Sequence, residues 1–410
     1  MSTDVYLVAG ARTAFGRYGG GLSHLRLDDL LGTVLVAACE RAGVARDQVD
    51  EIAAGCVNVA HEGMGDLGRW AALAAGFPDS VPGYTVNRFC ASSLTCAIQV
   101  ADAIRAGTVG IGIAGGAESM SRSGWAFMKG DAPFMPRGPL FILDTMWSGA
   151  GGPPHPALLA RNAYIDMIST AQKVADIWEI TREEMDAYAL RSHQRAAAAT
   201  ESGRFAREIV PVDAPTGKRG QTQRVERDES IRGDTTLEAL AALPPQPNLK
   251  DMTAGNSSPL NDGASAVVLA AHDRVEALGV KPLARVLGAA TVAVDPTIMG
   301  IAPAYAMPLA VQRSGLRVED VDIYEIHEAF SAQALAVRKE FARKTGFDIP
   351  DERVTPNGGA VAIGHPFGAT GTRYLLTLAH QLRVTGARYG CVGVCVGSGQ
   401  GVALVIERAA

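Results

Sequence analysis

The stretch NRFCASSLTCAIQVADAIRAGTVGIGIAGG, residues 87–116, contains in one run the elements that decide the fold. A loop ends at Cys90, an apolar pattern with helical spacing continues to about Gly107, and a strand-like run at 109–114 leads into two glycines. Helical and β-rich segments that alternate in this way are typical of α/β proteins. The stretch therefore predicts a helix over 91–106, a strand over 109–114 and a turn at Gly115 and Gly116.

The same order of elements recurs near the end of the chain. The segment 363–366, Ile-Gly-His-Pro, precedes an apolar helical pattern that closes near Gly386. A strand-like run at 391–396 follows, and then a glycine-rich turn that begins at Gly397. A potentially reactive side chain at a loop–helix junction, followed by helix, strand and glycines, thus occurs twice. We infer an internal duplication, although identity between the two copies is low.

The rest of the chain repeats the alternation of strands and helices. Apolar runs predict further strands at 5–9, 51–57, 265–270, 321–326 and 402–406. Helical patterns predict helices at 27–42, 67–75, 302–314, 329–344 and 370–384. This alternation predicts an α/β fold in which helices cover mostly parallel sheets.

The middle of the chain has a different composition. Residues 121–249 are rich in Gly, Pro and charge, with few strand signals and several helices, one of which begins at Thr181 with Glu184 completing a capping box. We interpret this region as an insertion folded over the core, where substrate contacts are often found. The expected domains are an N-terminal half (1–120 plus 250–272), the inserted loop domain (121–249) and a C-terminal half (273–410).

Composition limits the classes of function. The 410 residues exceed one compact core, and 47% hydrophobic with 20% charged residues is ordinary for a soluble enzyme. A net charge of −5 gives no support for a nucleic-acid or anionic-membrane partner. No apolar run reaches the roughly 20 residues of a membrane span, and no export signal is visible. Six cysteines without a disulfide pattern favour a cytoplasmic location.

Two residues at loop–helix junctions are candidates for chemistry. Cys90 precedes an apolar helix, and the partial positive charge of a helix N-terminus lowers a thiol pKa. His365 lies among five glycines in residues 358–371, where it could deprotonate a thiol. The alternatives are a buried core cysteine and a turn histidine without a chemical task.

Two further candidates follow predicted strands. His327 opens His-Glu-Ala-Phe, but position 331 is Ser, so the two-histidine zinc motif fails. Glu328 could orient a neighbour or cap the next helix. Cys395 precedes Gly-Ser-Gly-Gln-Gly, residues 397–401, whose spacing is not that of a dinucleotide fingerprint but whose backbone N–H groups could bind an oxyanion.

Taken together, the motifs resemble the thiolase family. The resemblance spans essentially the whole chain, in order, and rests on residues 86–94, 115–121, 253–264, 327–330, 358–366 and 395–401. It implies two similar mixed five-stranded α/β halves with an inserted loop domain, and a homodimer or homotetramer. It also implies acyl transfer between 3-oxoacyl-CoA and coenzyme A as co-substrate, with no permanently bound cofactor and no metal.

The resemblance also implies a role for each matching residue. Cys90 would be the acylated nucleophile, His365 its base and Cys395 the second acid/base. The N–H groups of Cys90 and Gly397 would form one oxyanion hole, and His327, or a water that it positions, would form the other with His365. Ser258 and Arg232 match positions that contact CoA, and Met167 and Phe330 match positions that line the acyl pocket. The histidine at position 327 favours the degradative thiolases of fatty-acid breakdown, with a possible β-oxidation partner enzyme.

Some positions depart from the family pattern, and two other classes of protein remain. The departures are Phe89, Ser93, Asp166, Ile168 and Ser398. A ketoacyl synthase would share the Cys with two His or Asn groups, but decarboxylative condensation needs no second cysteine such as Cys395. A non-catalytic acyl-CoA-binding scaffold would not need all four reactive side chains.

Overall fold

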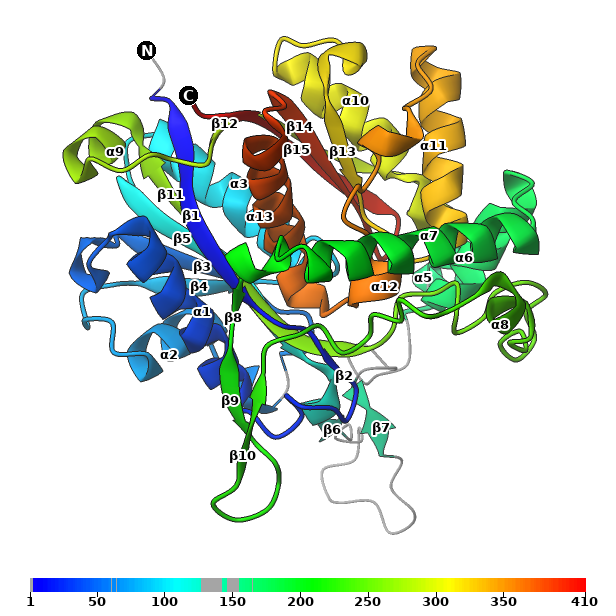
Figure 1. Cartoon of the computed structure of the whole chain (residues 1–410), viewed down its shortest axis with the longest axis horizontal. Helices are drawn as coiled ribbons and strands as arrows, with labels where there is room; N and C mark the ends of the chain where they lie inside the picture. Colours follow the sequence, from blue (N-terminus) through cyan, green and yellow to red (C-terminus); the bar gives the residue numbers. More distant parts are fainter. Residues whose placement is uncertain (1–2, 60, 64, 127–141, 146–154, 164) are drawn as a thin grey trace.

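The computed structural model describes residues 3–59, 61–63, 65–126, 142–145, 155–163 and 165–410 (Figure 1). The predicted α/β class is confirmed: strands run through the middle of the molecule and helices cover them. Both ends of the chain lie on the same side of the molecule. Among the helices in the described part of the chain, none has the length and apolar character needed to cross a membrane.

The N-terminal half contributes five strands to a mixed sheet. In spatial order these strands are β1 (Val5–Thr13), β11 (Asn261–Ala271), β5 (Ile111–Ser119), β3 (Glu51–Gly55) and β4 (Gly83–Val86). The first two pairings, β1 with β11 and β11 with β5, are antiparallel, and the next two are parallel. The sheet is thus mixed, and the prediction of mostly parallel sheets from alternation alone is wrong, because β11 and β1 come from distant parts of the chain.

The C-terminal half repeats this order. Its strands are β12 (Ala284–Ala293), β15 (Gln400–Arg408), β14 (Tyr389–Val396) and β13 (Ile323–Ile326), with two antiparallel pairings followed by a parallel one. The place of the fifth strand is taken by a single parallel bridge between Tyr324 and Val354. β1 and β12 pair along their edges, so the two halves form one continuous sheet. The expected duplication therefore appears in the order and direction of the strands.

Helices cover the faces of the two half-sheets, and others belong to the inserted region. Their bounds are α1 (Leu27–Ala42), α2 (Leu67–Ala74), α3 (Ser92–Arg105), α5 (Pro156–Ala160), α6 (Met167–Ile177), α7 (Arg182–Glu201), α8 (Leu237–Ala241), α9 (His272–Leu278), α10 (Pro303–Arg313), α11 (Ser331–Thr345), α12 (Ala360–Ile363) and α13 (Phe367–Thr385). α3 and α13 pack against each other in an apolar cluster that takes side chains from the strands of both halves. α1 and α2 cover the outer face of the first half, and α10 and α11 that of the second.

Burial on both faces explains the composition of the central strands. All eleven residues of β11 are buried, with Ala266 and Val268 in the cluster with α1 and Val267 and Leu269 in the cluster with α3 and α13. A strand covered on both sides is apolar throughout rather than alternating. The predicted turn at Gly115 and Gly116 is wrong for the same reason, because both glycines lie inside β5. A Cβ on Gly116 would come within 2.2 Å of the Gly368 carbonyl oxygen, so only glycine lets α13 approach this strand.

The remaining strands are short and belong mostly to the inserted region. They are β2 (Gly16–Arg17), β6 (Trp125–Ala126), β7 (Leu143–Asp144), β8 (Ile209–Val210), β9 (Val212–Pro215) and β10 (Thr222–Val225). The capping box predicted at Thr181 is confirmed: its hydroxyl accepts the N–H of Glu184, whose carboxylate accepts the N–H of Thr181. Parts of the expected inserted domain, residues 127–141, 146–154 and 164, lie outside the described residues.

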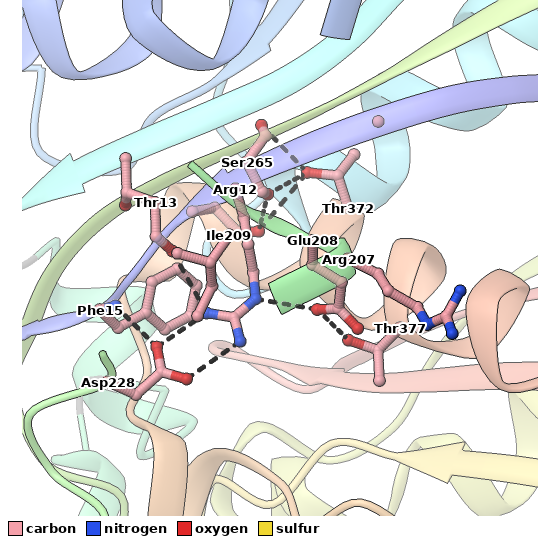
Figure 2. A network of polar contacts seen from close by, with 12 residues as sticks. Arg12, Thr13, Phe15, Arg207, Glu208, Ile209, Asp228, Ser265, Thr372 and Thr377 are labelled. Carbon is pink, nitrogen blue, oxygen red and sulfur yellow. Dashed lines mark hydrogen bonds and ion pairs between the residues drawn. The ribbon is translucent and has the colours of Figure 1, made fainter. Parts of the chain in front are cut away.

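A buried charge network anchors the inserted region to the core (Figure 2). The guanidinium of Arg12 on β1 is fully buried and binds both carboxylate oxygens of Asp228, at 2.7 and 3.0 Å, and Glu208 at 2.9 Å. Glu208 also accepts the hydroxyl of Thr377 on α13 at 2.9 Å. Since Glu208 and Asp228 belong to the inserted region, this network fixes it against β1 and α13.

Candidate active site

Two helix N-termini and two strand ends bring the four predicted reactive side chains together. Cys90 and His365 precede α3 and α13, which pack against each other, whereas His327 follows β13 and Cys395 lies near the end of β14. The His327 and His365 rings have centroids 4.3 Å apart, and the Cys395 sulfur lies 3.4 Å from Nδ1 of His327. Cys90 lies close enough to Cys395 to add to burial, the larger cause, in raising the pKa of the Cys395 thiol.

A tight turn presents Cys90 at the start of α3. Phe89 has a φ of 44°, in the left-handed region, and its N–H bonds to the side chain of Asn87 at 3.0 Å. The Ser92 hydroxyl donates to the Phe89 carbonyl oxygen at 2.6 Å and accepts the N–H of Arg88 at 2.9 Å. Strain of this kind in a non-glycine residue persists only where the surrounding contacts fix the turn. The turn directs Cys90 inward, whereas Phe89 is 41% exposed.

Burial dominates the ionisation of Cys90. It raises the pKa of the thiol to about 12, whereas hydrogen bonds from the backbone N–H groups of Gly397 and Cys90 itself act to lower it. The expectation that the helix N-terminus lowers this pKa is therefore wrong in its net direction, because desolvation outweighs the backbone dipoles. Cys90 is a neutral thiol at physiological pH, so it needs a base. The N–H groups of Gly397 and Cys90 both lie at the Cys90 sulfur, and their role as an oxyanion hole stays a prediction.

Hydrogen bonding fixes the tautomer of His365. Its Nδ1 lies 2.7 Å from the Thr370 hydroxyl, which donates its own hydrogen to the Pro366 carbonyl at 2.9 Å. The hydroxyl must then accept from Nδ1–H, which leaves Nε2 without a hydrogen and with a free lone pair. Nε2 is buried and has no hydrogen-bond partner among the described residues. Burial, reinforced by Arg373, lowers the pKa of His365 to about 3, so the ring is a neutral base at pH 7.

His327 and Cys395 form the second pair. Burial lowers the pKa of His327 well below its ordinary value, with His365 and Arg373 adding to the effect, so the imidazole is neutral. Burial likewise raises the pKa of Cys395 well above its ordinary value, which keeps a proton on this thiol. A protonated thiol beside a neutral imidazole can act as a general acid.

Glu328 positions the loop that carries His327. Its buried carboxylate accepts the hydroxyls of Ser192 at 2.6 Å and Tyr188 at 3.1 Å, both on α7 of the inserted region. It also accepts the backbone N–H of Val361 at 3.4 Å, in α12 shortly before His365. Glu328 thus orients its neighbours rather than capping α11, so the first of the two sequence interpretations is the one observed.

The four residues expected to contact the substrate do not all lie beside the reactive side chains. Met167 and Phe330 lie in or against the apolar cluster that contains Cys395. The N–H of Ser258 bonds to the Ala329 carbonyl at 2.9 Å, two residues from His327. Arg232 is exposed on a loop held by its own N–H to Nδ1 of His193 at 3.1 Å. Among the described residues, no contact joins Arg232 to the four reactive side chains.

Three positioning residues were not found from the sequence. Thr370 fixes His365, and Asn261 accepts the backbone N–H of His365 at 3.2 Å. The hydroxyl of Tyr374 accepts the N–H groups of Glu328 and Ala360 at 3.2 and 3.0 Å. Thr370 and Tyr374 are four residues apart on a helix that begins beside a candidate histidine, and that spacing is a signal the sequence carries.

Three of the departures from the family pattern have a contact or a backbone conformation that the structure describes. The hydroxyl of Ser93 accepts the N–H of Thr372 at 3.1 Å and so joins α3 to α13. Asp166 is the N-cap of α6 and accepts the N–H of Ser169 at 2.9 Å. Ser398 has a φ of 62°, a conformation that favours glycine.

Comparison with known proteins shows the family of the chain. Residues 5–273 match the thiolase N-terminal domain and residues 280–408 the thiolase C-terminal domain. The chain is 45% identical to a beta-ketoadipyl-CoA thiolase of Pseudomonas knackmussii over 100% of both chains. It is 39% identical to a 3-oxoadipyl-CoA/3-oxo-5,6-dehydrosuberyl-CoA thiolase of Escherichia coli over 99% of both. It is similar to human mitochondrial 3-ketoacyl-CoA thiolase in complex with CoA, with a TM-score of 0.89, 34% identity and 99% and 98% coverage.

The fold and the comparisons define an acyltransferase. Acyl transfer through a cysteine uses a thiol, a neutral base and hydrogen-bond donors for an oxyanion, and the buried Cys90 thiol and the neutral His365 ring are groups of the first two kinds. The chain belongs to the thiolase family. It is an acyltransferase, and its reaction is coenzyme A-dependent thiolytic cleavage.

Proposed function

We propose that this thiolase cleaves 3-oxoadipyl-CoA with coenzyme A to give succinyl-CoA and acetyl-CoA. Two relatives whose names state 3-oxoadipyl-CoA or beta-ketoadipyl-CoA as substrate align with essentially the whole chain at 45% and 39% identity. This refines the expectation of fatty-acid breakdown to a short dicarboxylic substrate. The observation that carries the proposal is the convergence of both Cys–His pairs in one buried site within this full-length similarity.

The first half-reaction forms an acyl-enzyme. Nε2 of His365 takes the proton of the Cys90 thiol while the sulfur bonds to C3 of the substrate. A thiol with a pKa near 12 and an imidazole with a pKa near 3 do not form a resting ion pair, so proton transfer accompanies attack. Collapse of the adduct breaks the C2–C3 bond, and its electron pair becomes the enolate of acetyl-CoA. Cys395 gives its proton to C2 and becomes a thiolate.

The second half-reaction returns every proton. The thiolate of Cys395 takes the proton of the incoming coenzyme A thiol, whose sulfur attacks the succinyl group on Cys90. Cys90 leaves as a thiolate and recovers its proton from the His365 imidazolium. The scheme is a ping-pong acyl transfer in which neither cysteine gains or loses a proton over a full cycle.

Two sets of donors stabilise the negative charge that develops in turn. The N–H groups of Cys90 and Gly397 bind the C3 oxyanion, and a preorganised donor of this kind contributes roughly 3–4 kcal/mol. Nε2 of His327, with the protonated His365, binds the thioester oxygen of the enolate. This role assigns the single hydrogen of the His327 ring to Nε2, with Nδ1 accepting the S–H of Cys395.

The test is thiolysis by the purified protein with matched substrates. 3-Oxoadipyl-CoA would be compared with 3-oxohexanoyl-CoA, which has the same acyl chain length without the terminal carboxylate, and with acetoacetyl-CoA. We expect coenzyme A-dependent cleavage with the highest kcat/KM for 3-oxoadipyl-CoA, and none with Cys90→Ala. A preference for 3-oxohexanoyl-CoA would refute the dicarboxylic substrate, and full activity of Cys90→Ala would refute the assigned nucleophile.

A further inference from the structure

A charged side chain on the helix that follows His365 is buried without a hydrogen-bond partner among the described residues. Arg373 on α13 is fully buried, and none of its three guanidinium nitrogens has a hydrogen-bond partner among the described residues. Glu325 on β13 is also fully buried, with both carboxylate oxygens unpartnered in the same part of the chain. Burying an unpaired cation is costly, so its retention at this place needs an explanation.

The guanidinium is held on the face of an aromatic ring that contacts the active site. The Arg373 Cζ atom lies 3.7 Å from the centroid of the Tyr374 ring, a cation–π arrangement. The Tyr374 ring in turn meets the His327 ring edge-on at 5.8 Å. Thr370, one helical turn before Arg373 and Tyr374, accepts the hydrogen bond of His365. One end of α13 therefore carries the cation and the residues that hold both histidines.

A buried positive charge disfavours a second one nearby. At an effective dielectric constant of about 20, a unit charge roughly 10 Å away weakens proton binding by about tenfold. Arg373 lowers the pKa of both histidines. For His365, burial is the larger cause and Arg373 the second. For His327, burial and His365 are the larger causes and Arg373 the third.

We propose that Arg373 is a positioning residue whose buried cation, held on Tyr374, keeps both active-site histidines uncharged. The inference rests on the proposed function, in which His365 must accept a proton from Cys90 and a neutral His327 must donate a hydrogen bond. A cation that cannot lose its proton gives this effect at every physiological pH.

The other charged groups around Arg373 do not cancel its charge by a direct contact. Burial raises the pKa of Glu325 to about 8, against the opposing effect of Arg373, and burial also raises the pKa of Glu328. The groups that face Arg373 or act on these two carboxyls are His327 and Glu328 from the loop after β13, Glu325 from β13, His365 and Tyr374 from α13 and its preceding loop, Tyr188, Arg191 and Arg195 from α7, and Glu208 from the inserted region.

The experiment is a histidine NMR titration that requires no turnover. The full-length protein, labelled with 13C at Cε1 of histidine, would be titrated from pH 8 to pH 4.5, and His365→Asn and His327→Asn would assign the two signals. We expect Arg373→Met to increase the proton-bound fraction of His365 about tenfold at the lowest pH. Arg373→Lys, which keeps the charge, should stay within about twofold of the wild type, as should Arg383→Met, which removes an exposed arginine from the same helix.

The pH profile of thiolysis separates a charge effect from a structural one. The acid limb of kcat/KM should move to higher pH in Arg373→Met, with most of the activity recovered at pH 8, where both histidines are neutral in either protein. If Arg373→Met fails to fold, the double variant E325Q/R373M removes both buried ionisable side chains and should show the same histidine titration. Unchanged titration of both histidines in a folded variant without Arg373 would overturn the proposal, whether or not the protein cleaves 3-oxoadipyl-CoA.

Discussion

Removal of the Thr370 hydroxyl would test the tautomer of His365 with a change to a single hydrogen-bonding group. This hydroxyl accepts the Nδ1 hydrogen of His365 at 2.7 Å and thereby directs the lone pair of Nε2 toward catalysis. Thr370→Val removes the acceptor and leaves a buried N–H without a partner. Such a group costs about 1–3 kcal/mol, which corresponds to about a 5- to 150-fold loss. We expect kcat/KM for thiolysis to fall within this range, because the ring can also flip to the tautomer that carries hydrogen on Nε2.

The matched control is Thr370→Ser, which keeps the hydroxyl and loses only a methyl group. It should retain kcat/KM within about threefold. The rate of Cys90 alkylation by iodoacetamide should follow the same order in the three proteins, since the base acts on the thiol before any substrate carbonyl is involved. A valine variant with wild-type kcat/KM, or a serine variant as impaired as the valine variant, would refute the tautomer argument.

Three further perturbations test other parts of the structure. Cys395→Ala should lower kcat by at least about 10²-fold, the scale of a lost acid/base group, yet leave Cys90 alkylation within a few-fold; equal loss of both would contradict separate roles. Arg12→Met should lower the free energy of unfolding in urea by about 3–5 kcal/mol, because Asp228 remains buried and unpaired; a loss below about 1 kcal/mol would contradict the anchoring role. For His365 the pKa is about 3 when folded and ordinary when unfolded, so its stabilising contribution is present above about pH 6.5 and is lost as pH falls toward 3. His365→Asn should therefore gain about 2 kcal/mol relative to the wild type between pH 7 and pH 5, and an unchanged difference would contradict a neutral buried ring.

Local patterns were sufficient to predict the elements that carry the reactive side chains. The apolar spacing of 91–106 and its closing glycine correspond to α3, and the helix at 27–42 has the observed bounds of α1. β12 was not predicted, because ARVLGAATVA is rich in small residues and its strand character comes from pairing with β15 far along the chain. Gly115 and Gly116 read as a turn but form strand, because the approach of α13 replaces their missing side chains.

Some residues of the site can likewise be predicted from nearby sequence, whereas others depend on contacts with distant segments. Cys90, His365, His327 and Cys395 are recognisable from the glycines and element ends around them. The partners of Glu328 on α7 lie more than a hundred residues away, so no local pattern reveals them. The predicted direction of the pKa shift of Cys90 is wrong for a related reason. The helix dipole is a local property, whereas the burial that outweighs it comes from the packing of both halves.

The central claim is that Cys90 carries the acyl group cut from C3 of a dicarboxylic 3-oxoacyl-CoA. Peptide mass mapping of the protein quenched after mixing with 3-oxoadipyl-CoA tests this most directly. We expect a succinyl group on the peptide that contains Cys90, formed together with one equivalent of acetyl-CoA and removed as succinyl-CoA when coenzyme A is added. A protein that releases acetyl-CoA without any acyl group on Cys90, or that carries the group on Cys395 instead, would contradict it.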